Sequence, residues 1–152
     1  MIVAKFGGSS LADGNQFKKV KNIVLSDSER KYIIPSAPGK RGPGDDKVTD
    51  LLYACHDAAK AGKVFKHLLG RIRERYEEIA EEIGVSFDFT PDFEDIANEL
   101  TKGTTRDYIA SRGEFLNGKL LAAYLEFPFV DAARVIRFDS NGHFMKEKSN
   151  TL

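Results

Sequence analysis

Apolar residues occur along this chain in short runs and at helical spacing. Residues 1–6 are apolar except for Lys5, a pattern typical of a strand buried on both faces of a parallel sheet. Residues 15–25 carry apolar side chains at helical spacing, and residues 32–34 form a second apolar run. Strand, helix and strand in so few residues predict a βαβ unit with parallel strands and a right-handed crossover. The carboxyl ends of both strands then open on one edge of the sheet, where α/β proteins bind ligands.

Helical periodicity dominates the rest of the chain. We predict four further helices. The first begins near Val48, the second extends over 64–83 and ends at Gly84, the third covers about 92–101, and the fourth covers about 109–124. The outer face of the 64–83 helix is predicted to be a solvated charge array that includes Arg75. Residues 128–132 and 134–138 are predicted to form two short strands, and residues 140–142 a turn. The 84–103 segment suggests no chemistry.

A glycine turn follows the first predicted strand. Gly7 and Gly8 permit a sharp turn, and Ser9 stands where a helix would begin. Unhindered N–H groups, a helix dipole and the charge of Lys5 together make a layout that binds phosphate. Because the lysine precedes the glycines, the turn is neither a Walker A loop nor a Rossmann fingerprint. On the residues alone, an ordinary strand-to-helix turn is an equal alternative.

Two later positions are candidates for binding a small charged ligand. Thr49 lies in the first turn of its helix, where its hydroxyl is placed either to bind a carboxylate or to cap the helix. Glu114 is flanked on its helix face by Ala110 and Gly118, so its carboxylate is predicted to lie in a depression that suits an ammonium group. The alternative is that the two glycines of this helix, Gly113 and Gly118, only permit close helix packing and that Glu114 is partly exposed. The proline- and glycine-rich loop over 35–47 reads by composition as a surface connection.

Composition changes this picture little. A chain of 152 residues that is 41% hydrophobic predicts a single compact unit. Lysine plus arginine equals aspartate plus glutamate at 23 each, so the overall charge favours neither nucleic acid nor an anionic membrane as a partner. No apolar stretch approaches about 18 residues, and we expect a soluble, cytoplasmic protein. Cys55 is the only cysteine and the three histidines lack metal-ligand spacing, so no disulfide or metal site is predicted.

Three segments, in order, resemble the aspartokinase branch of the amino acid kinase family. They are KFGGSS at 5–10, SAPGK at 36–40 with KVTDLL at 47–52, and SRGE at 111–114. The residues at 131–134, Asp-Ala-Ala-Arg, are similar to a further D-A-R-like element of that branch. The resemblance covers essentially the whole chain. The family's G-R-G-G-S-D-like segment, its adenine-binding half and the ACT regulatory domains of aspartokinases have no counterpart in residues 1–152.

The resemblance implies an α/β fold of the carbamate kinase-like, three-layer α/β/α type with a mainly parallel sheet. Residues 1–152 would form its N-terminal, acceptor-binding part. The implied reaction is transfer of the γ-phosphoryl group of ATP, with Mg²⁺, to the β-carboxylate of L-aspartate. We expect a homo-oligomer that is inactive as this chain alone. The resemblance also implies the site residues. Lys5 would be catalytic and would bind phosphate together with Gly7, Gly8 and Ser9. The aspartate would be bound by Ser36, Ala37, Thr49 and Glu114.

The sequence leaves two alternatives open. One is another amino acid kinase, acting on glutamate, acetylglutamate, carbamate or UMP. The other is a non-catalytic remnant that binds a carboxylate or dimerises through the 64–83 helix.

Overall fold

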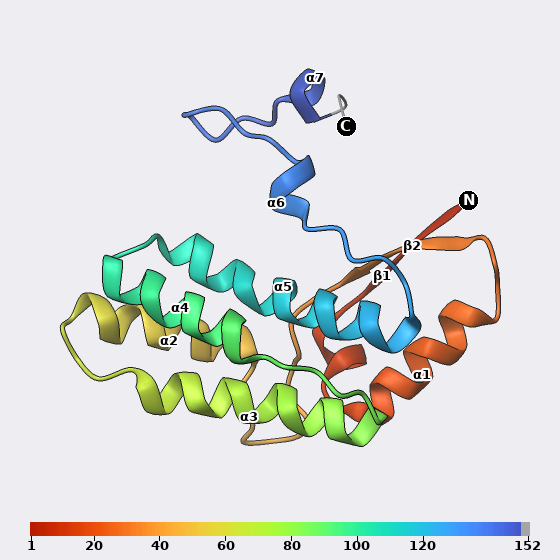
Figure 1. Ribbon diagram of the computed structural model, residues 1–152, viewed down its shortest axis with the longest axis horizontal. Coiled ribbons are helices and arrows are strands. Elements are labelled where there is room, and N and C mark those ends of the chain that lie inside the picture. Colours follow the sequence, from red (N-terminus) through yellow and green to blue (C-terminus); the bar gives the residue numbers. More distant parts are fainter. Residues whose placement is uncertain (150–152) are drawn as a thin grey trace.

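The structure, a computed structural model, describes residues 1–149. The two strands lie beside α1, helices α2 to α5 pack side by side, and the segment after α5 extends away from the body (Figure 1). The elements in chain order are β1 (Ile2–Phe6), the short 3-10 helix η1 (Gly8–Leu11), α1 (Gly14–Leu25), β2 (Arg30–Pro35), α2 (Val48–Lys60), α3 (Lys66–Ile83), α4 (Thr90–Lys102), α5 (Arg106–Leu125), α6 (Ala132–Val135) and α7 (Lys146–Ser149).

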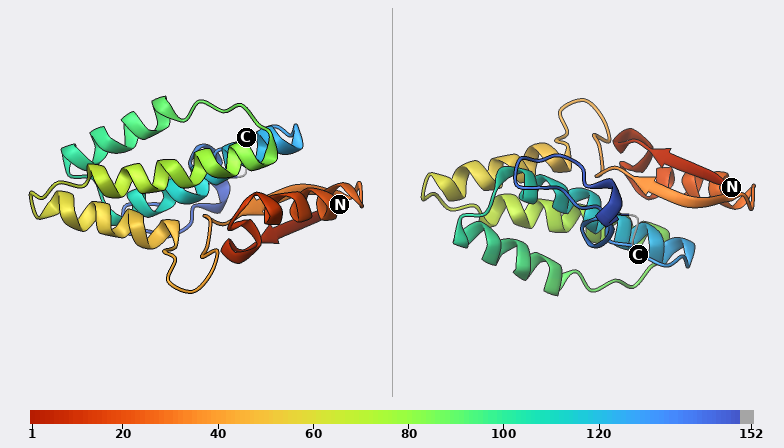
Figure 2. Two further views of the ribbon diagram at one scale, coloured as in Figure 1. Left: turned by 90° about the horizontal axis from the view of Figure 1, so that it is seen from below. Right: turned by 90° about the horizontal axis from the view of Figure 1, so that it is seen from above.

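The strand pair forms as predicted. β1 and β2 are parallel, with Lys5 opposite Ile34 and Phe6 opposite Pro35. The Ser36 amide donates a hydrogen bond of 2.9 Å to the carbonyl oxygen of Phe6, which continues the pairing beyond the strand ends. Figure 2 shows the two strands with α1 alongside them. Both carboxyl ends therefore open at the same edge, and the expected α/β class with a parallel sheet is confirmed.

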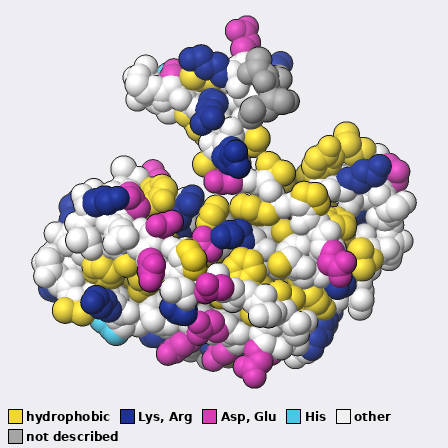
Figure 3. Space-filling view, in the orientation of Figure 1, with side chains coloured by type: hydrophobic (Ala, Val, Ile, Leu, Met, Phe, Trp, Pro, Cys, Tyr) yellow, Lys and Arg dark blue, Asp and Glu magenta, His cyan; other side chains and the backbone are white. Residues whose placement is uncertain are grey.

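The prediction that β1 is buried on both faces is wrong. Val3 is 63% exposed, and on β2 Tyr32 is 55% exposed and Ile34 51% exposed. Within residues 1–149 the sheet has only these two strands, so each has an outer edge without a neighbour. Hydrophobic side chains accordingly gather on the surface near the N-terminal strands (Figure 3).

The core lies where α1 and the four long helices meet. Helices α1 to α5 each bury apolar side chains there, and α3 ends at Gly84, whose φ of 72° closes the helix in the left-handed conformation. None of the helices within residues 1–149 has the length and apolar character that a membrane span requires. The largest fully buried side chains are Leu11, Phe17, Leu52, Ile72, Tyr76, Ile79, Phe89, Ile96, Ile109, Leu116, Leu120 and Leu121.

Arg75 departs from the predicted charge array on α3. Its side chain is buried, whereas acidic side chains gather along the outer edge that α3 forms (Figure 3). Arg75 lies three residues after Ile72 and four before Ile79, so it belongs to the stripe that faces the core. The position of Arg75 on the helix therefore places it in the core, and the prediction that it is solvated, which rested on its charge, is wrong.

The two strands predicted for 128–138 are also wrong. Residues 132–135 form the short helix α6, and the only pairing in this part of the described chain is a bridge between Phe138 and Phe144. Asp131 caps α6, since its Oδ1 accepts the Ala133 amide at 3.0 Å. This cap and the two alanines after it favour a helical turn over an extended strand. The turn predicted at 140–142 is confirmed by a hydrogen bond of 3.0 Å from the Gly142 amide to the Asp139 carbonyl.

Candidate functional site

The glycine turn after β1 leads into a short 3-10 helix. Gly7 precedes η1, and α1 begins only at Gly14, so the helix expected at Ser9 is a single tight turn. The amides of Gly8 and Ser9 are the first two of this turn and have no acceptor among residues 1–149. Backbone N–H groups of this kind are available to an anion.

The turn is held against the loop that follows β2. The Gly39 amide donates a hydrogen bond of 2.8 Å to the Gly8 carbonyl oxygen. A Cβ atom on Gly39 would lie 2.7 Å from the Gly8 carbonyl carbon, and one on Gly8 would lie 2.9 Å from the Ala37 oxygen. Both positions therefore need glycine so that the two backbone segments can touch.

Lys5 and Ser36 lie together at this edge. Lys5 is exposed, and its Nζ lies 3.5 Å from Ser36 Oγ, which is long for a hydrogen bond. No carboxylate of residues 1–149 forms an ion pair with Lys5, so its charge is available. The Ser36 backbone is fixed on both sides, because its amide donates to Phe6 and its carbonyl accepts the Asn117 side-chain amide at 2.7 Å.

Helix α5 approaches the same segment through Gly113. A Cβ atom on Gly113 would lie 2.7 Å from Ala37 Cβ and 3.2 Å from Leu52 Cδ1. The buried Tyr76 hydroxyl donates a hydrogen bond of 2.7 Å to the Gly113 carbonyl. Close packing by a small residue, the alternative raised from the sequence, is thus what Gly113 does.

Glu114 follows Gly113 and faces solvent. Its side chain is exposed and makes no hydrogen bond or ion pair with any of residues 1–149. Burial and, after it, the negative charge of Glu114 raise the pKa of Tyr76 well above its ordinary value, against the opposing charge of Arg75. The carboxylate therefore lies open to a cation from solution, beside a rigid point of α5.

Thr49 is the second residue of α2 and is half-buried. The N-cap position belongs to Lys47, and the Thr49 hydroxyl makes no hydrogen bond within residues 1–149. The plain cap considered from the sequence is therefore excluded. The Val48 amide donates a hydrogen bond of 3.1 Å to the Pro38 carbonyl, which ties the start of α2 to the loop that carries Ser36.

The structure thus brings the predicted segments to one edge. The 7–9 turn touches the 36–39 segment, which touches both Gly113 and the start of α2. No hydrogen bond or ion pair of the described chain joins Glu114 to Lys5 directly. Within residues 1–149 no group of three histidine, cysteine, aspartate or glutamate side chains is arranged to hold a metal ion.

Sequence reasoning missed three residues that support this edge: Arg75, Asp45 and Asn117. Their spacing offered a signal in two cases. Arg75 falls on the buried stripe of α3, and Asn117 follows Gly113 by four residues, so it shares the buried face of α5. Asp45 lies in an irregular loop, where no periodicity exists to reveal its partner.

Comparison with known proteins matches residues 1–151 to the amino acid kinase family. Aspartokinase 3 of Bacillus subtilis (strain 168) is 38% identical over 156 aligned residues, which cover 99% of this chain and 34% of the relative. Aspartokinase 2, chloroplastic, of Arabidopsis thaliana is 33% identical over 136 residues, covering 81% of this chain and 24% of the relative.

Solved structures give the same picture. The crystal structure of Clostridium acetobutylicum aspartate kinase matches with a TM-score of 0.92 and 52% identity, over 98% of this chain and 34% of that protein. Escherichia coli aspartokinase III, in complex with aspartate and ADP, matches in fold with a TM-score of 0.76 and 24% identity, over 98% of this chain and 36% of that protein. The chain therefore spans about a third of the length of these proteins.

Proposed function

Since this chain belongs to the amino acid kinase family, we propose that it forms the N-terminal, acceptor-binding part of an aspartate kinase. The observation that carries the proposal is the 52% identity to Clostridium acetobutylicum aspartate kinase over 98% of this chain. The reaction would transfer the γ-phosphoryl group of ATP to the β-carboxylate of L-aspartate. The relatives named above are all aspartokinases, which favours aspartate over glutamate, acetylglutamate, carbamate or UMP as the acceptor.

The exposed edge of the sheet supports this reaction chemically. A carboxylate that attacks a phosphate brings two anions together, so catalysis needs positioning and charge neutralisation more than proton transfer. Lys5 would neutralise the charge of the transferring group. The free amides of Gly8 and Ser9, which follow the turn at Gly7, would donate hydrogen bonds to phosphate oxygens. No general base is needed, because the acceptor carboxylate is already ionised at neutral pH.

The acceptor would lie between the 36–37 segment and α5. Ser36, Ala37 and the free hydroxyl of Thr49 would line its pocket, and the open carboxylate of Glu114 would bind its ammonium group. We assign ATP with Mg²⁺ as the phosphoryl donor. Its adenine would bind in the part of the relatives that this chain does not span, so we expect residues 1–152 alone to produce no acyl phosphate above a Lys5→Ala control.

A chimera tests the proposed function. Residues 1–152 would replace the matching third of Clostridium acetobutylicum aspartate kinase, and ADP release would be measured with L-aspartate and with the four other acceptors. We expect turnover with L-aspartate and formation of a hydroxamate when hydroxylamine is present. A folded chimera that prefers another acceptor, or that releases no ADP with L-aspartate, would overturn the proposal.

A further inference from the structure

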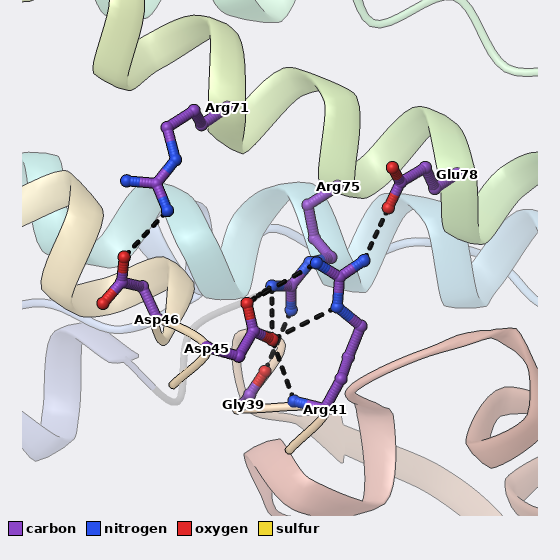
Figure 4. A network of polar contacts seen from close by, with 7 residues as sticks. All are labelled: Gly39, Arg41, Asp45, Asp46, Arg71, Arg75 and Glu78. Carbon is purple, nitrogen blue, oxygen red and sulfur yellow. Dashed lines mark hydrogen bonds and ion pairs between the residues drawn. The ribbon is translucent and has the colours of Figure 1, made fainter. Parts of the chain in front are cut away.

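Arg75 is a buried, positively charged residue that forms hydrogen bonds to the loop after β2. Its guanidinium lies in the core stripe of α3 and is 5% exposed, so it needs partners to offset the loss of water. Nη2 donates to both carboxylate oxygens of Asp45, at 2.7 and 2.6 Å, and Nη1 donates to the Gly39 carbonyl at 3.1 Å. One arginine thus holds two points of the loop on α3 (Figure 4).

Asp45 is organised by the loop itself. The Arg41 amide donates to Asp45 Oδ2 at 2.9 Å and the Arg41 side chain at 3.2 Å, while Arg41 also reaches Glu78 on α3 at 2.6 Å. Burial opposes ionisation of Asp45, but the hydrogen bonds from Arg41 and the charges of Arg75 and Arg41 outweigh it and hold the pKa of this carboxyl well below its usual range. Asp45 is therefore a fully charged partner for Arg75.

Gly39 connects this ion pair to the glycine turn. Its carbonyl accepts from Arg75, and its amide donates to Gly8 on the opposite side. The close approach of Gly39 to the Gly8–Ser9 peptide leaves no room for a Cβ atom. Two consecutive hydrogen bonds therefore lead from the buried arginine to the turn whose amides are free.

A second ion pair between the same elements offers an internal comparison. Arg71, one turn earlier on α3, donates to Asp46 at 2.8 Å. These side chains are 50% and 47% exposed, and neither has a hydrogen bond to Gly39. Figure 4 shows the Arg71–Asp46 pair apart from the Arg75, Asp45 and Gly39 cluster.

We propose that Arg75, held by Asp45, is a positioning residue that sets the separation between the Gly8–Ser9 turn and the segment that carries Ser36 and Ala37. This inference rests on the proposed function, because it assigns Arg75 to the alignment of the phosphate and acceptor sites. Arg75 acts through Gly39 and does not touch the reacting groups. A displacement of about 1 Å between reacting groups can lower the rate of a reaction about 100-fold. Loss of the alignment set by Arg75 should therefore lower kcat more than it raises the KM for aspartate.

Nuclear magnetic resonance of the isotope-labelled chain, residues 1–152, tests the positioning directly. Arg75→Lys keeps a positive charge near Asp45 but replaces the planar guanidinium with a single ammonium group. The lysine cannot therefore donate hydrogen bonds to both Asp45 and Gly39 in the geometry of the arginine. We expect the coupling across the Gly39 to Gly8 hydrogen bond to be lost and the Gly8 and Ser9 amide shifts to move. Arg71→Lys, the matched control, should leave these signals unchanged. A folded Arg75→Lys chain with the coupling and shifts of the parent would overturn the proposal.

Asp45→Asn provides a second variant if Arg75→Lys does not fold. It leaves Arg75 in place without its charged partner, and we expect the same amide shifts to move in the same direction. Unchanged Gly8 and Ser9 shifts in Asp45→Asn would equally overturn the proposal.

A kinetic measurement on the chimera described above separates this inference from the proposed function. We expect Arg75→Lys to lower kcat about 10- to 100-fold while the KM for aspartate stays within about threefold. Arg71→Lys should match the parent. An unchanged kcat would overturn the positioning role. An inactive parent chimera would instead refute the proposed function, and the resonance measurement would still decide whether Arg75 sets the position of the turn.

Discussion

Asn117 donates its side-chain amide to the carbonyl oxygen of Ser36 at 2.7 Å, while its own Oδ1 is buried with no hydrogen-bond partner among residues 1–149. The bond joins the middle of α5 to the residue that follows β2, and the side chain of that residue, Ser36, lies beside Lys5. Over residues 113–117, helix α5 carries three different groups: the backbone of Gly113 without a side chain, the carboxylate of Glu114 and the amide of Asn117. Each of them bears on the candidate acceptor site.

Removing the Asn117 amide should destabilise the chain. Asn117→Ala leaves the partly buried Ser36 carbonyl without its donor, and we expect the free energy of unfolding to fall by about 1 to 3 kcal/mol. Chemical denaturation measures this change. Asn98→Ala, at an exposed position of α4, is the control and should change stability by less than about 1 kcal/mol. Equal effects of the two substitutions would contradict a structural role for the Asn117 bond.

Two glycines in helix interiors should respond oppositely to alanine. At Gly113 a Cβ atom would lie 2.7 Å from Ala37 Cβ, so Gly113→Ala should cost about 1 to 3 kcal/mol of stability through overpacking. At Gly70 on α3 nothing lies within 4 Å of the added atom, and Gly70→Ala should stabilise by about 0.5 to 1 kcal/mol. Thermal or chemical unfolding distinguishes the two. Stabilisation by both substitutions would mean that α5 does not need its close approach to the 36–37 segment.

The contribution of Asp45 should depend on pH. Its pKa lies below the usual range in the folded state, so its stabilising effect is complete above the unfolded value, near about 4, and is lost as the pH falls through the folded value. We expect Asp45→Asn to cost about 2 kcal/mol at pH 7 and progressively less below about pH 4. Unfolding of parent and variant would be followed from pH 7 to 2. A difference that stays constant across this range would show that Asp45 is not a charged partner of Arg75.

Local patterns in the sequence predicted most of this fold. Periodicity located the long helices, and the glycine at position 84 marked the end of α3 because it tolerates a positive φ. The segments at 5–10 and 36–40 could be expected at one sheet edge because parallel strands end on the same side, whereas this argument does not place the helical segment at 111–114. These features depend on spacing and on backbone conformation, which short stretches of sequence determine.

What sequence reasoning missed depends on contacts between distant segments. Arg75 was assigned to solvent by its charge, although its partners, Asp45 and Gly39, lie 30 and 36 residues away. The amide of Asn117 meets Ser36 across 81 residues. The exposure of Val3 reflects the number of strands beside it, which the apolar run of β1 does not reveal.

The exposed strand pair should promote self-association of this chain. Ile2, Val3, Tyr32 and Ile34 are each at least 40% exposed, and both strands have an outer edge without a neighbour within residues 1–149. We expect the sedimentation coefficient to rise with concentration over the micromolar range. Charged substitutions at Val3 and Tyr32 should reduce this rise. A cooperative, highly stable monomer at high concentration would count against an exposed sheet of this kind.

The assignment of Lys5 and Glu114 to different roles is the centre of the proposed function, and steady-state kinetics of the chimera can separate them. Lys5→Met removes the charge that, in the proposed function, would neutralise the transferring group, so it should lower kcat by about 100-fold or more. Glu114→Gln keeps the size and polarity of the side chain but removes the charge that would face the ammonium group. Its effect should therefore fall on aspartate affinity and leave the KM for ATP nearly unchanged.

The KM for aspartate of Glu114→Gln, with ATP saturating, is the deciding measurement. The loss of a charge-assisted hydrogen bond, about 2 to 3 kcal/mol, corresponds to a rise of roughly 30- to 150-fold. Glu126→Gln, on the residue that follows α5, controls for a change of net charge and should leave this KM at the parent value. An aspartate KM for Glu114→Gln within about twofold of the parent would contradict an acceptor site that binds the ammonium group at Glu114.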